Sequence, residues 1–451
     1  MTPRKVLFLL QPGTNSRDIL IGMIEGFQQA GHETLVLGLE QLWNPIRERP
    51  RDEGTIRSAF AAQLRELIRT KQIDLVVAMW ANGVTSLPVV QVDGRTHSFF
   101  DEIGCPHLLY WLDAPHWAHN GQVPGWAATG LFEGDRLFHV VNNEGTAGEM
   151  RRVLRFKHVA AVPYGVSTTQ FAPPEPRPEI EFDLVFVLGA GEQPPSPKML
   201  VELERDEPDI EGIRREIADR VRQKLHRQHA GLIDALVRSQ LDQRDTPMLA
   251  RVDAVRSWSP ELATPIDSLL SSAQSFIDVT ATIRRIDNWY RAFVFCWLDR
   301  RFKCLRVGGG ELPGWPVRGE SVGYEADVRR QSFHYARGLA GLSVMRWQDD
   351  IGIHLKPLEI SASGVPCLCM RRPGIEAMFR DGEEILVFES LAGAGGLLGR
   401  LKTEKGLRDR LGSAAQDRVR RDHTWKKRSE ELNPSLLFEA TTDVEEGSSV
   451  E

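Results

Sequence analysis

The chain has 451 residues, of which 41% are hydrophobic and 26% charged, and its formal net charge is -6. A single hydrophobic core does not support a chain of this length, so two domains are expected. Nucleic-acid binding needs a basic domain or stripe, whereas here Arg is interleaved with Asp and Glu under a negative net charge. Nucleic acid is therefore not expected among the partners.

No apolar run reaches the roughly 18 residues of a membrane-spanning helix, so integral membrane association is not expected either. The five cysteines are an odd number without the spacing of a disulfide framework, which suggests reduced thiols. These features predict a cytoplasmic protein, and they leave its oligomeric state open.

Residues 1–170 alternate short apolar runs with longer amphipathic ones. The strands predicted from this pattern are Lys5–Leu10, Thr34–Leu39, Ile73–Trp80, His107–Leu112, Leu137–Val141 and His158–Pro163, and the helices are Ser16–Ala30, Ile56–Thr70 and Gly145–Leu154. Such alternation predicts a parallel, doubly wound sheet, which binds ligands beyond the carboxyl ends of its strands. The loops Gln11–Asn15, Ala81–Gly83 and Asp113–His119 are therefore expected at one edge.

The proline-rich run Ala172–Glu179 is the predicted boundary between a first domain of residues 1–170 and a second of residues 171–430. Within the second, residues 198–301 have helical periodicity and many charges, as at Ile213, Ile217 and Val221, and predict a helical insertion. The strands predicted around it are Phe182–Leu188, Lys303–Val307, Leu342–Met345, Pro366–Met370 and Glu384–Phe388. Terminal helices are expected over Leu391–Asp422, and residues 431–451 form a tail whose acidic, Ser-rich end is expected to be disordered.

The segment with most chemical information is Gly352-Ile-His-Leu-Lys-Pro-Leu-Glu. Pro357 suits the first position of a short helix that ends at Gly364, and the amides at such a helix start attract an anion. Lys356 can neutralise a phosphate there, and Glu359 can accept hydrogen bonds from two ribose hydroxyls. Two plainer interpretations stay open: a surface lysine for Lys356, and a carboxylate that only complements the helix dipole for Glu359.

This segment resembles the nucleotide-diphosphate signature of GT-B glycosyltransferases, and within them the CgeB-like proteins of the glycosyl transferases group 1 family, which have a basic residue shortly before the Glu. The run from Arg372 to Phe388 is similar to the strand, turn and helix that follow in the family. His423-Thr-Trp resembles the family's closing helix, and Pro163 to Pro173 resembles the segment that leaves the first domain.

The resemblance implies an α/β protein of GT-B fold, with two Rossmann-like domains, a cleft between them, and the helical insertion in the second. It implies transfer of a sugar from a nucleoside-diphosphate sugar to an acceptor, which is a glycan, a protein or a small molecule. The donor is a substrate, and no further cofactor is implied. No Asp-x-Asp motif occurs in the chain, so a carboxylate-held metal ion is not expected, and the lysine and the helix dipole take over its role.

One departure from the family pattern supports a rival hypothesis. Many GT-B enzymes have another Glu eight positions before the ribose-binding one, but this position is Ile351 here, and Asp349 and Asp350 are out of register. The alternative is a degenerate GT-B-fold protein that binds a glycan or serves in assembly without turnover.

Two residues are candidates for the catalytic base that removes a proton from the acceptor: Asp113, after a predicted strand, and His116. The candidates for nucleotide-sugar binding are Gly13, Asn15, Gly189, Gly309, Gly323, His354, Lys356, Glu359 and Glu376. Plainer roles remain open for several of them: a turn cap for Asp113, an ordinary strand–helix turn for Gln11–Asn15, and a solvent-facing helix position for Glu376. Trp111, Trp117 and Trp315 are either sugar platforms or packing residues.

Overall fold

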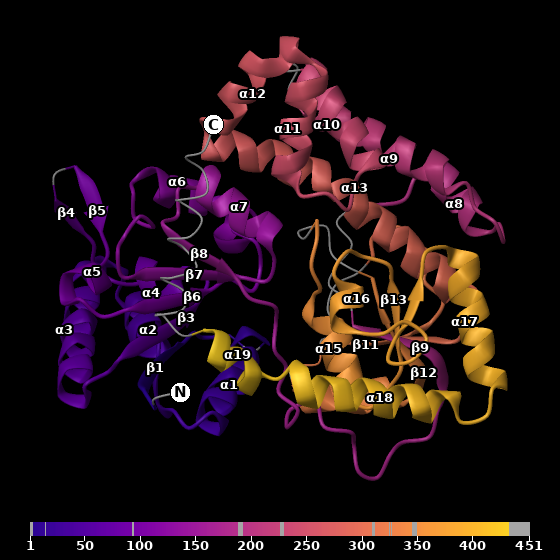
Figure 1. The fold of residues 1–451 in the computed structure, drawn as a ribbon, viewed down its shortest axis with the longest axis horizontal. Coiled ribbons are helices and arrows are strands. Elements are labelled where there is room, and N and C mark those ends of the chain that lie inside the picture. Colours follow the sequence, from indigo (N-terminus) through magenta and orange to yellow (C-terminus); the bar gives the residue numbers. More distant parts are fainter. Residues whose placement is uncertain are drawn as a thin grey trace. The chain divides into compact units, whose positions relative to one another are not determined.

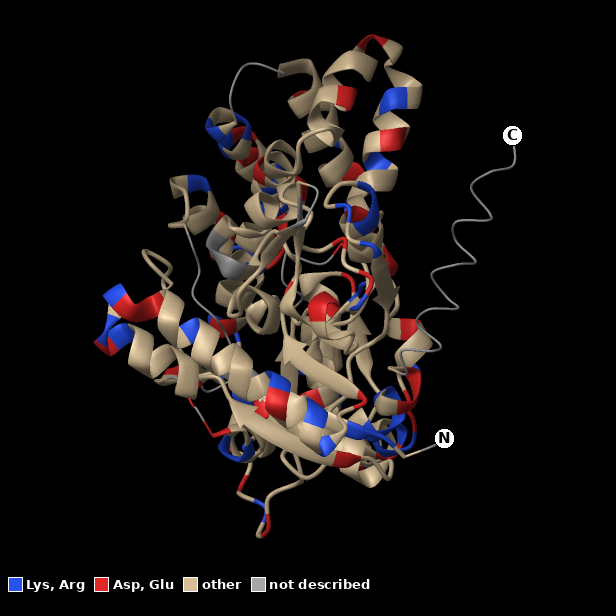
Figure 2. Cartoon of the chain, turned by 90° about the vertical axis from the view of Figure 1, so that its left-hand side faces the viewer, with Lys and Arg blue, Asp and Glu red and all other residues tan. Residues whose placement is uncertain are grey.

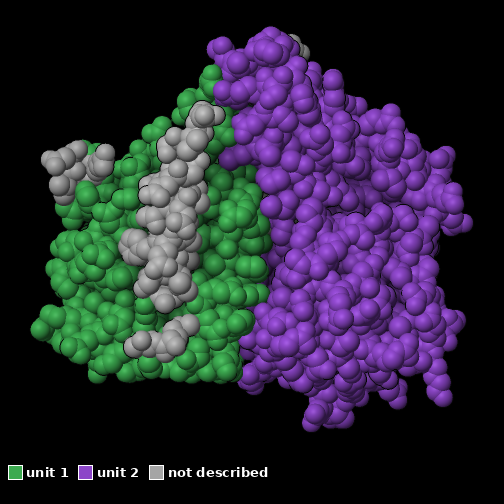
Figure 3. Space-filling view, viewed as in Figure 1, with its two compact units in different colours: residues 1–163, 267–278, 425–451 green, residues 164–266, 279–424 purple. Residues whose placement is uncertain are grey.

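The structure is a computed structural model that describes residues 3–13, 15–92, 94–187, 193–225, 230–308, 312–323, 325, 327–344 and 350–432. The candidates Gly189 and Gly309 and the tail from residue 433 lie outside the described residues. The chain forms two compact units (Figure 1 and Figure 3). Unit 1 comprises residues 1–163, 267–278 and 425–451, and unit 2 comprises residues 164–266 and 279–424.

Unit 1 is built on a six-stranded sheet of order β2-β1-β3-β6-β7-β8, in which all neighbours are parallel. Its strands are β1 (Lys5–Leu10), β2 (Glu33–Gly38), β3 (Leu75–Met79), β6 (His107–Tyr110), β7 (Leu137–Val141) and β8 (His158–Ala161). Strands β3, β6 and β7 are buried along their whole length, which explains their continuous apolar sequence. The parallel sheet predicted for this half is confirmed.

Helices alternate with these strands. They are α1 (Asn15–Gln29), α2 (Glu40–Glu48), α3 (Glu53–Lys71), α4 (Asn82–Thr85), α5 (Phe99–Ile103), α6 (Val123–Ala128) and α7 (Glu144–Arg152), and a small hairpin of β4 (Val90–Val92) and β5 (Arg95–His97) precedes α5. The last helix within the described residues, α19 (Trp425–Glu431), packs against α1 at Gly26, where an added Cβ would lie 2.5 Å from Trp425. Glycine at this position lets a segment from the end of the chain complete unit 1.

Unit 2 contains the second six-stranded parallel sheet, of order β11-β10-β9-β12-β13-β14. Its strands are β9 (Phe182–Val187), β10 (Cys304–Val307), β11 (Glu320–Val322), β12 (Gly338–Ser343), β13 (Cys367–Met370) and β14 (Leu386–Phe388). The helices that follow these strands are α14 (Val328–Ala336), α15 (Leu355–Ala362), α16 (Ile375–Met378), α17 (Leu391–Thr403) and α18 (Leu407–Asp422). The second parallel sheet predicted from the sequence is also confirmed.

The predicted helical insertion lies between β9 and β10 (Figure 1). It consists of α8 (Pro197–Leu203), α9 (Ile210–Lys224), α10 (Ala230–Asp242), α11 (Met248–Trp258), α12 (Ala263–Leu270) and the long α13 (Ala273–Asp299). Ile213, Ile217 and Val221 are all buried on α9, as their helical spacing predicts. Residues 267–278 of this segment belong to unit 1.

Charges of both signs are interspersed along the outer helices (Figure 2). On α9, for example, Arg215 pairs with Glu211 and Arg222 pairs with Asp219. None of the helices within the described ranges has both the length and the apolar character needed to cross a bilayer.

Candidate functional site

Helix α15 connects β12 to β13 and begins at the carboxyl edge of the second sheet. His354 is its N-cap residue in an extended conformation, and Leu355 is its first helical residue. The prediction that Pro357 takes the first helical position was wrong, because Pro357 is the third. It still lies in the first turn, where its missing N–H breaks no helical hydrogen bond.

Two glycines allow α15 to pack closely against its neighbours. A Cβ at Gly341 of β12 would lie 2.7 Å from the side chain of Ile360, so the helix can sit low on the sheet. Gly364 ends the helix with a φ of +69°, a conformation that favours glycine. The position of the start of α15 at the sheet edge is therefore fixed by the packing at both ends.

A hollow lies in front of this helix start, and we call it the α15 hollow. It is lined by Val187, Leu342, Ser343 and Val344 at the ends of β9 and β12, by His354 and Lys356 of α15, and by Arg291 and Phe295 of α13. Its volume is about 380 Å³ with the open mouth included. Helix-start amides, a lysine and an arginine beside one hollow make it suited to an anion.

Lys356 and Glu359 form one polar cluster on α15. The Nζ atom of Lys356 donates to Glu359 Oε2 at 2.5 Å and to Gln331 Oε1 at 3.5 Å. Glu359 is only 6% exposed, whereas Lys356 is partly exposed and lines the hollow. Burial, together with the nearby Glu359 carboxylate, keeps the pKa of Tyr335 well above its ordinary value.

A second hollow adjoins the first, and we call it the arginine hollow. Its lining residues are Arg244, Asp287, Tyr290, Arg291, Val344, Met370 and Arg372, and its volume is about 270 Å³ with the open mouth included. Arg291 and Val344 line both hollows. The sequence did not identify this feature, since arginines on amphipathic insertion helices have the pattern of a solvated helix face.

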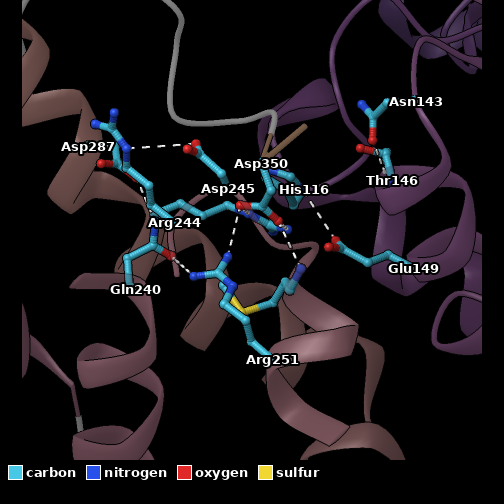
Figure 4. A network of polar contacts seen from close by, with 12 residues as sticks. His116, Asn143, Thr146, Glu149, Gln240, Arg244, Asp245, Arg251, Asp287 and Asp350 are labelled. Atoms are coloured by element: carbon cyan, nitrogen blue, oxygen red, sulfur yellow. Dashed lines mark hydrogen bonds and ion pairs between the residues drawn. The ribbon is translucent and has the colours of Figure 1, made fainter. Parts of the chain in front are cut away.

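Asp350, which precedes α15, lies in a buried ion cluster with two arginines of the insertion (Figure 4). Its carboxylate accepts from Arg251 Nη2 at 2.9 Å and from Arg284 Nη2 at 2.6 Å, and it also accepts from the backbone N–H of Met248 at 3.0 Å. Burial raises the pKa of Asp350, but the attraction of Arg284 and Arg251 outweighs burial and holds it at about 2. Asp350 thus ties the loop before α15 to the insertion. It lines neither hollow, but the charge of Arg372 in the arginine hollow also lowers its pKa.

The other candidates of unit 2 lie apart from this cluster. Glu376 is exposed on α16 and forms an ion pair with Arg371. Gly323 is exposed directly after the edge strand β11. Trp315 is buried, and its indole N–H donates to the carbonyl of Gln193 at 2.8 Å, so it is a packing residue. No group of three His, Cys, Asp or Glu side chains suited to holding a metal ion occurs among the described residues.

In unit 1, the loops after β1 and β3 meet at the carboxyl edge of the sheet, as predicted. The side chain of Asn82 donates to Gln11 Oε1 at 2.6 Å. Gly13 is exposed with a φ of +126°, and Asn15 is the first residue of α1. Asp113 is half-buried and follows β6, which is the neighbour of β3.

His116 lies in a third hollow, which belongs to unit 1 and which we call the His116 hollow. It is lined by Pro115, His116, Glu149, Met150, Leu154, Phe276 and Ile277, with a volume of about 210 Å³ including the open part. The Nδ1 atom of His116 is 4.0 Å from Oε2 of Glu149 on α7 (Figure 4). Both side chains are buried, with exposed fractions of 2% and 7%. The sequence did not identify Glu149, because it stands among arginines on what reads as a surface helix.

The tryptophan next to the predicted base is also a packing residue. Trp111 is 1% exposed, and its indole N–H donates to Nδ1 of His139 at 3.1 Å. Trp117 is exposed.

Residues 286–433 match the family model described as Glycosyl transferase-like. Solved structures similar to this chain include sucrose-phosphate synthase from Thermosynechococcus elongatus, at 10% identity over 99% of both chains with a TM-score of 0.48. Another is the Anabaena protein HepE in complex with UDP and glucose, at 10% identity over 96% of this chain and 100% of that one, with a TM-score of 0.47. A third is the phage T4 β-glucosyltransferase, at 10% identity over 99% and 100% of the two chains with a TM-score of 0.44.

No curated protein sequence matches the chain. The segment that matches the family model begins in α13 and includes α15, with Lys356 and Glu359, and most of the second sheet. Residues 286–433 therefore resemble a glycosyl transferase-like domain, and the chain contains two units that are each built on a parallel six-stranded sheet.

Proposed function

We propose that this chain is a glycosyltransferase of GT-B fold that transfers a sugar from a nucleoside-diphosphate sugar to an acceptor hydroxyl without a metal ion. The observation that carries the proposal is the α15 hollow, where Lys356, His354 and the start of α15 lie together at the carboxyl ends of β9 and β12. The basic residues shortly before Glu359 also support placing the chain in the CgeB-like branch of the family. The acceptor class, whether glycan, protein or small molecule, is open.

The diphosphate of the donor is assigned to the amides at the start of α15 and to Lys356. Positive charge at this place stabilises the negative charge that grows on the diphosphate as the bond to the sugar breaks. Arg291 lines the same hollow and adds a second cation. Lysine, arginine and the helix dipole thus supply the charge stabilisation that a metal ion provides in other enzymes.

Glu359 is assigned to the ribose of the donor. Its buried carboxylate has two oxygens, and Lys356 contacts one of them. A carboxylate can accept two hydrogen bonds from adjacent hydroxyls, and a contact to a charged acceptor is stronger than one between neutral groups.

His116 is assigned as the base that accepts the proton of the acceptor hydroxyl, with Asp113 as the alternative. A histidine beside a carboxylate is a recurring general base, because the carboxylate orients the ring and stabilises its protonated form. Glu149 takes that orienting role at 4.0 Å from Nδ1. Glu149 is therefore a positioning residue in this proposal.

The test combines ligand binding with turnover in buffer that contains EDTA. Thermal unfolding is followed with UDP, GDP, ADP and dTDP and with their glucose or mannose conjugates, and release of nucleoside diphosphate is measured in parallel. We expect one base series to raise stability, by about 2.7 kcal/mol at a hundredfold excess over the dissociation constant. We also expect the same donor to be hydrolysed slowly without added metal.

Three results would contradict this proposal in whole or in part. If no nucleotide stabilises the chain, the α15 hollow does not bind the diphosphate of a donor. Binding without hydrolysis or transfer on any acceptor would favour the glycan-binding or assembly protein instead. If hydrolysis stops in EDTA and returns with Mg²⁺ or Mn²⁺, the enzyme needs a metal ion, and only that part of the proposal is wrong.

A further inference from the structure

We propose that the arginine hollow binds a carboxylate on the sugar that is transferred, so that the donor is a nucleoside-diphosphate uronic acid or a similarly acidic sugar. This inference rests on the proposed function, because it places the donor's diphosphate in the α15 hollow. It specifies the substrate class that the second hollow selects.

The two hollows are neighbours and share two lining residues. Arg291 of α13 and Val344 after β12 line both of them. The Nε atom of Arg291 donates to the carbonyl of Val344 at 2.8 Å, which fixes this arginine at the boundary. A sugar joined to a diphosphate at the start of α15 can therefore extend past Arg291 into the arginine hollow.

Three separate segments each bring a guanidinium to the arginine hollow. Arg244 comes from the turn between α10 and α11, Arg291 from α13, and Arg372 from the loop after β13. A guanidinium presents paired N–H groups that match the two oxygens of a carboxylate. An uncharged hexose offers only hydroxyls and has no group that requires several arginines.

Two acidic side chains of this region, Asp287 and Asp245, have basic or polar neighbours, although Oδ1 of Asp287 accepts no hydrogen bond. Asp287 accepts from Gln240 Nε2 at 2.6 Å and lies 4.0 Å from Arg214. Asp245 pairs with Arg372 at 3.2 Å and with Arg244 at 3.7 Å. The three guanidinium groups outnumber these two carboxylates by one, which leaves a positive charge for one further carboxylate.

Tyr290 adds a neutral donor to the same wall. Burial raises the pKa of Tyr290 above its ordinary value, so its hydroxyl stays protonated and can donate a hydrogen bond. Such a donor complements a carboxylate without adding charge.

The contrast with the buried cluster around Asp350 separates a binding role from a structural one. Arg251 and Arg284 hold Asp350 at 2.9 and 2.6 Å, and both arginines are almost fully buried. Arg244 has its nearest described carboxylate at 3.7 Å, and its side chain is 21% exposed in an open hollow. Its geometry leaves room for an incoming anion, whereas the cluster around Asp350 is closed.

The experiment measures dissociation constants by calorimetry on the full chain. The probes are UDP, UDP-glucose and UDP-glucuronate, together with GDP, GDP-mannose and GDP-mannuronate. We expect the uronate of the base series that binds to have about tenfold or greater affinity over its neutral counterpart, as charge-assisted hydrogen bonds predict. In the variant Arg244→Gln this preference should fall to about twofold or less, while affinity for the bare nucleoside diphosphate is retained.

Arg215→Gln is the matched control, since Arg215 is an exposed arginine of the insertion that pairs with Glu211. This control should keep the preference. Arg244→Lys retains the charge but loses the paired N–H groups, so it should give an intermediate preference. The substitutions at Arg244 and Arg215 lie in a partly exposed turn and on an exposed helix face, so we expect these variants to fold. Arg372→Gln is a second variant, in the loop after β13.

The outcomes separate this inference from the proposed function. Equal affinity for neutral and acidic sugars, with the nucleoside diphosphate still bound, would overturn the inference alone. A preference that survives in both Arg244→Gln and Arg372→Gln would also overturn it. If loss of either arginine weakens the bare nucleoside diphosphate as much as the uronate, the arginines bind the diphosphate and the inference is wrong. If no nucleotide binds to the wild-type chain, the inference and the proposed function are overturned together.

Discussion

The ammonium group of Lys356 lies 2.5 Å from a carboxylate oxygen of Glu359, one turn further along α15. The pair joins the residue assigned to the diphosphate with the residue assigned to the ribose. It neutralises the buried carboxylate when no donor is present, and it orients the lysine along the wall of the α15 hollow. The two residues should therefore contribute to nucleotide binding in different but coupled ways.

Replacement of Glu359 by Gln should lower affinity for the nucleoside diphosphate by about tenfold or more, because the amide replaces a charged acceptor of ribose hydrogen bonds. Calorimetric titration of wild type and variant measures this change. The control is Glu404→Gln, which removes an exposed carboxylate paired with Arg400. If wild type and Glu359→Gln have equal affinities, the Glu359 carboxylate does not bind the ribose and only complements the helix dipole and pairs with Lys356.

Replacement of Lys356 by Met should act on the phosphates. We expect about tenfold or greater loss of affinity for the nucleoside diphosphate, little change for the free nucleoside, and a weaker dependence of affinity on salt. Titrations with nucleoside, monophosphate and diphosphate at two ionic strengths test this. The exposed Lys427, which pairs with Glu430, provides the control Lys427→Met. An equal loss for nucleoside and diphosphate would show that Lys356 acts only by holding Glu359.

The sequence predicted the two sheets well, because parallel strands buried on both faces leave nearly continuous apolar runs such as Leu137–Val141. It also placed Lys356 and Glu359 at a helix start on a sheet edge, where they lie. Its error at Pro357 arose because proline is tolerated throughout the first turn, so its position does not define the first residue.

Features that depend on contacts between distant segments were not predictable. The packing of Trp425 against Gly26, which brings α19 to unit 1, has no local signature. Glu149 and Arg244 line hollows in the structure but have the sequence pattern of ordinary charged helix and turn residues. Only the fold brings Glu149 to His116 and Arg244 to Arg372.

Replacement of His116 by Gln, or of Glu149 by Gln, should lower turnover and leave donor affinity unchanged, since the base acts on the acceptor. Loss of a general base typically costs about 10² to 10⁴ in rate, and loss of its orienting carboxylate should cost less. The Glu149→Gln variant should also change the pH profile of turnover, which a merely structural role would not do. Glu144→Gln, an exposed position on the same helix that pairs with Arg151, is the control.

The measurements are the rate of transfer or donor hydrolysis between pH 5.5 and 9 and the affinity for the donor. If His116→Gln retains full turnover, Asp113 becomes the base, and Asp113→Asn should then abolish activity.

Replacement of Asp350 by Asn should destabilise unit 2, because it leaves the buried guanidinium groups of Arg251 and Arg284 without a counter-charge. Removing one partner of a buried ion pair costs about 3 to 5 kcal/mol. Urea unfolding measures this loss in the free energy of unfolding. Asp409→Asn, an exposed residue near Arg408, should cost less than about 1 kcal/mol. A small effect at Asp350 would mean that the cluster adds no net stability.

The stability of unit 1 should fall as the pH is lowered from about 6.5, and His139 is one cause. Burial lowers the pKa of His139 from 6.5 to about 3. Between these values the unfolded chain binds a proton at this site and the folded chain does not, so acid favours unfolding. Through this group alone, the free energy of unfolding should be about 2 kcal/mol lower at pH 5 than at pH 7.5. The buried His107, whose pKa is also lowered by burial, acts in the same direction.

Urea unfolding at pH 7.5, 6 and 5 tests this dependence, because few carboxylates titrate in that range. The variant His139→Gln keeps an acceptor for the indole N–H of Trp111 but has no titrating ring. We expect the variant to lose about 2 kcal/mol less than wild type between pH 7.5 and 5, with the remaining dependence due to His107 and other histidines. If wild type and His139→Gln lose the same stability over this range, His139 is accessible to protons in the folded state and its burial does not couple folding to pH.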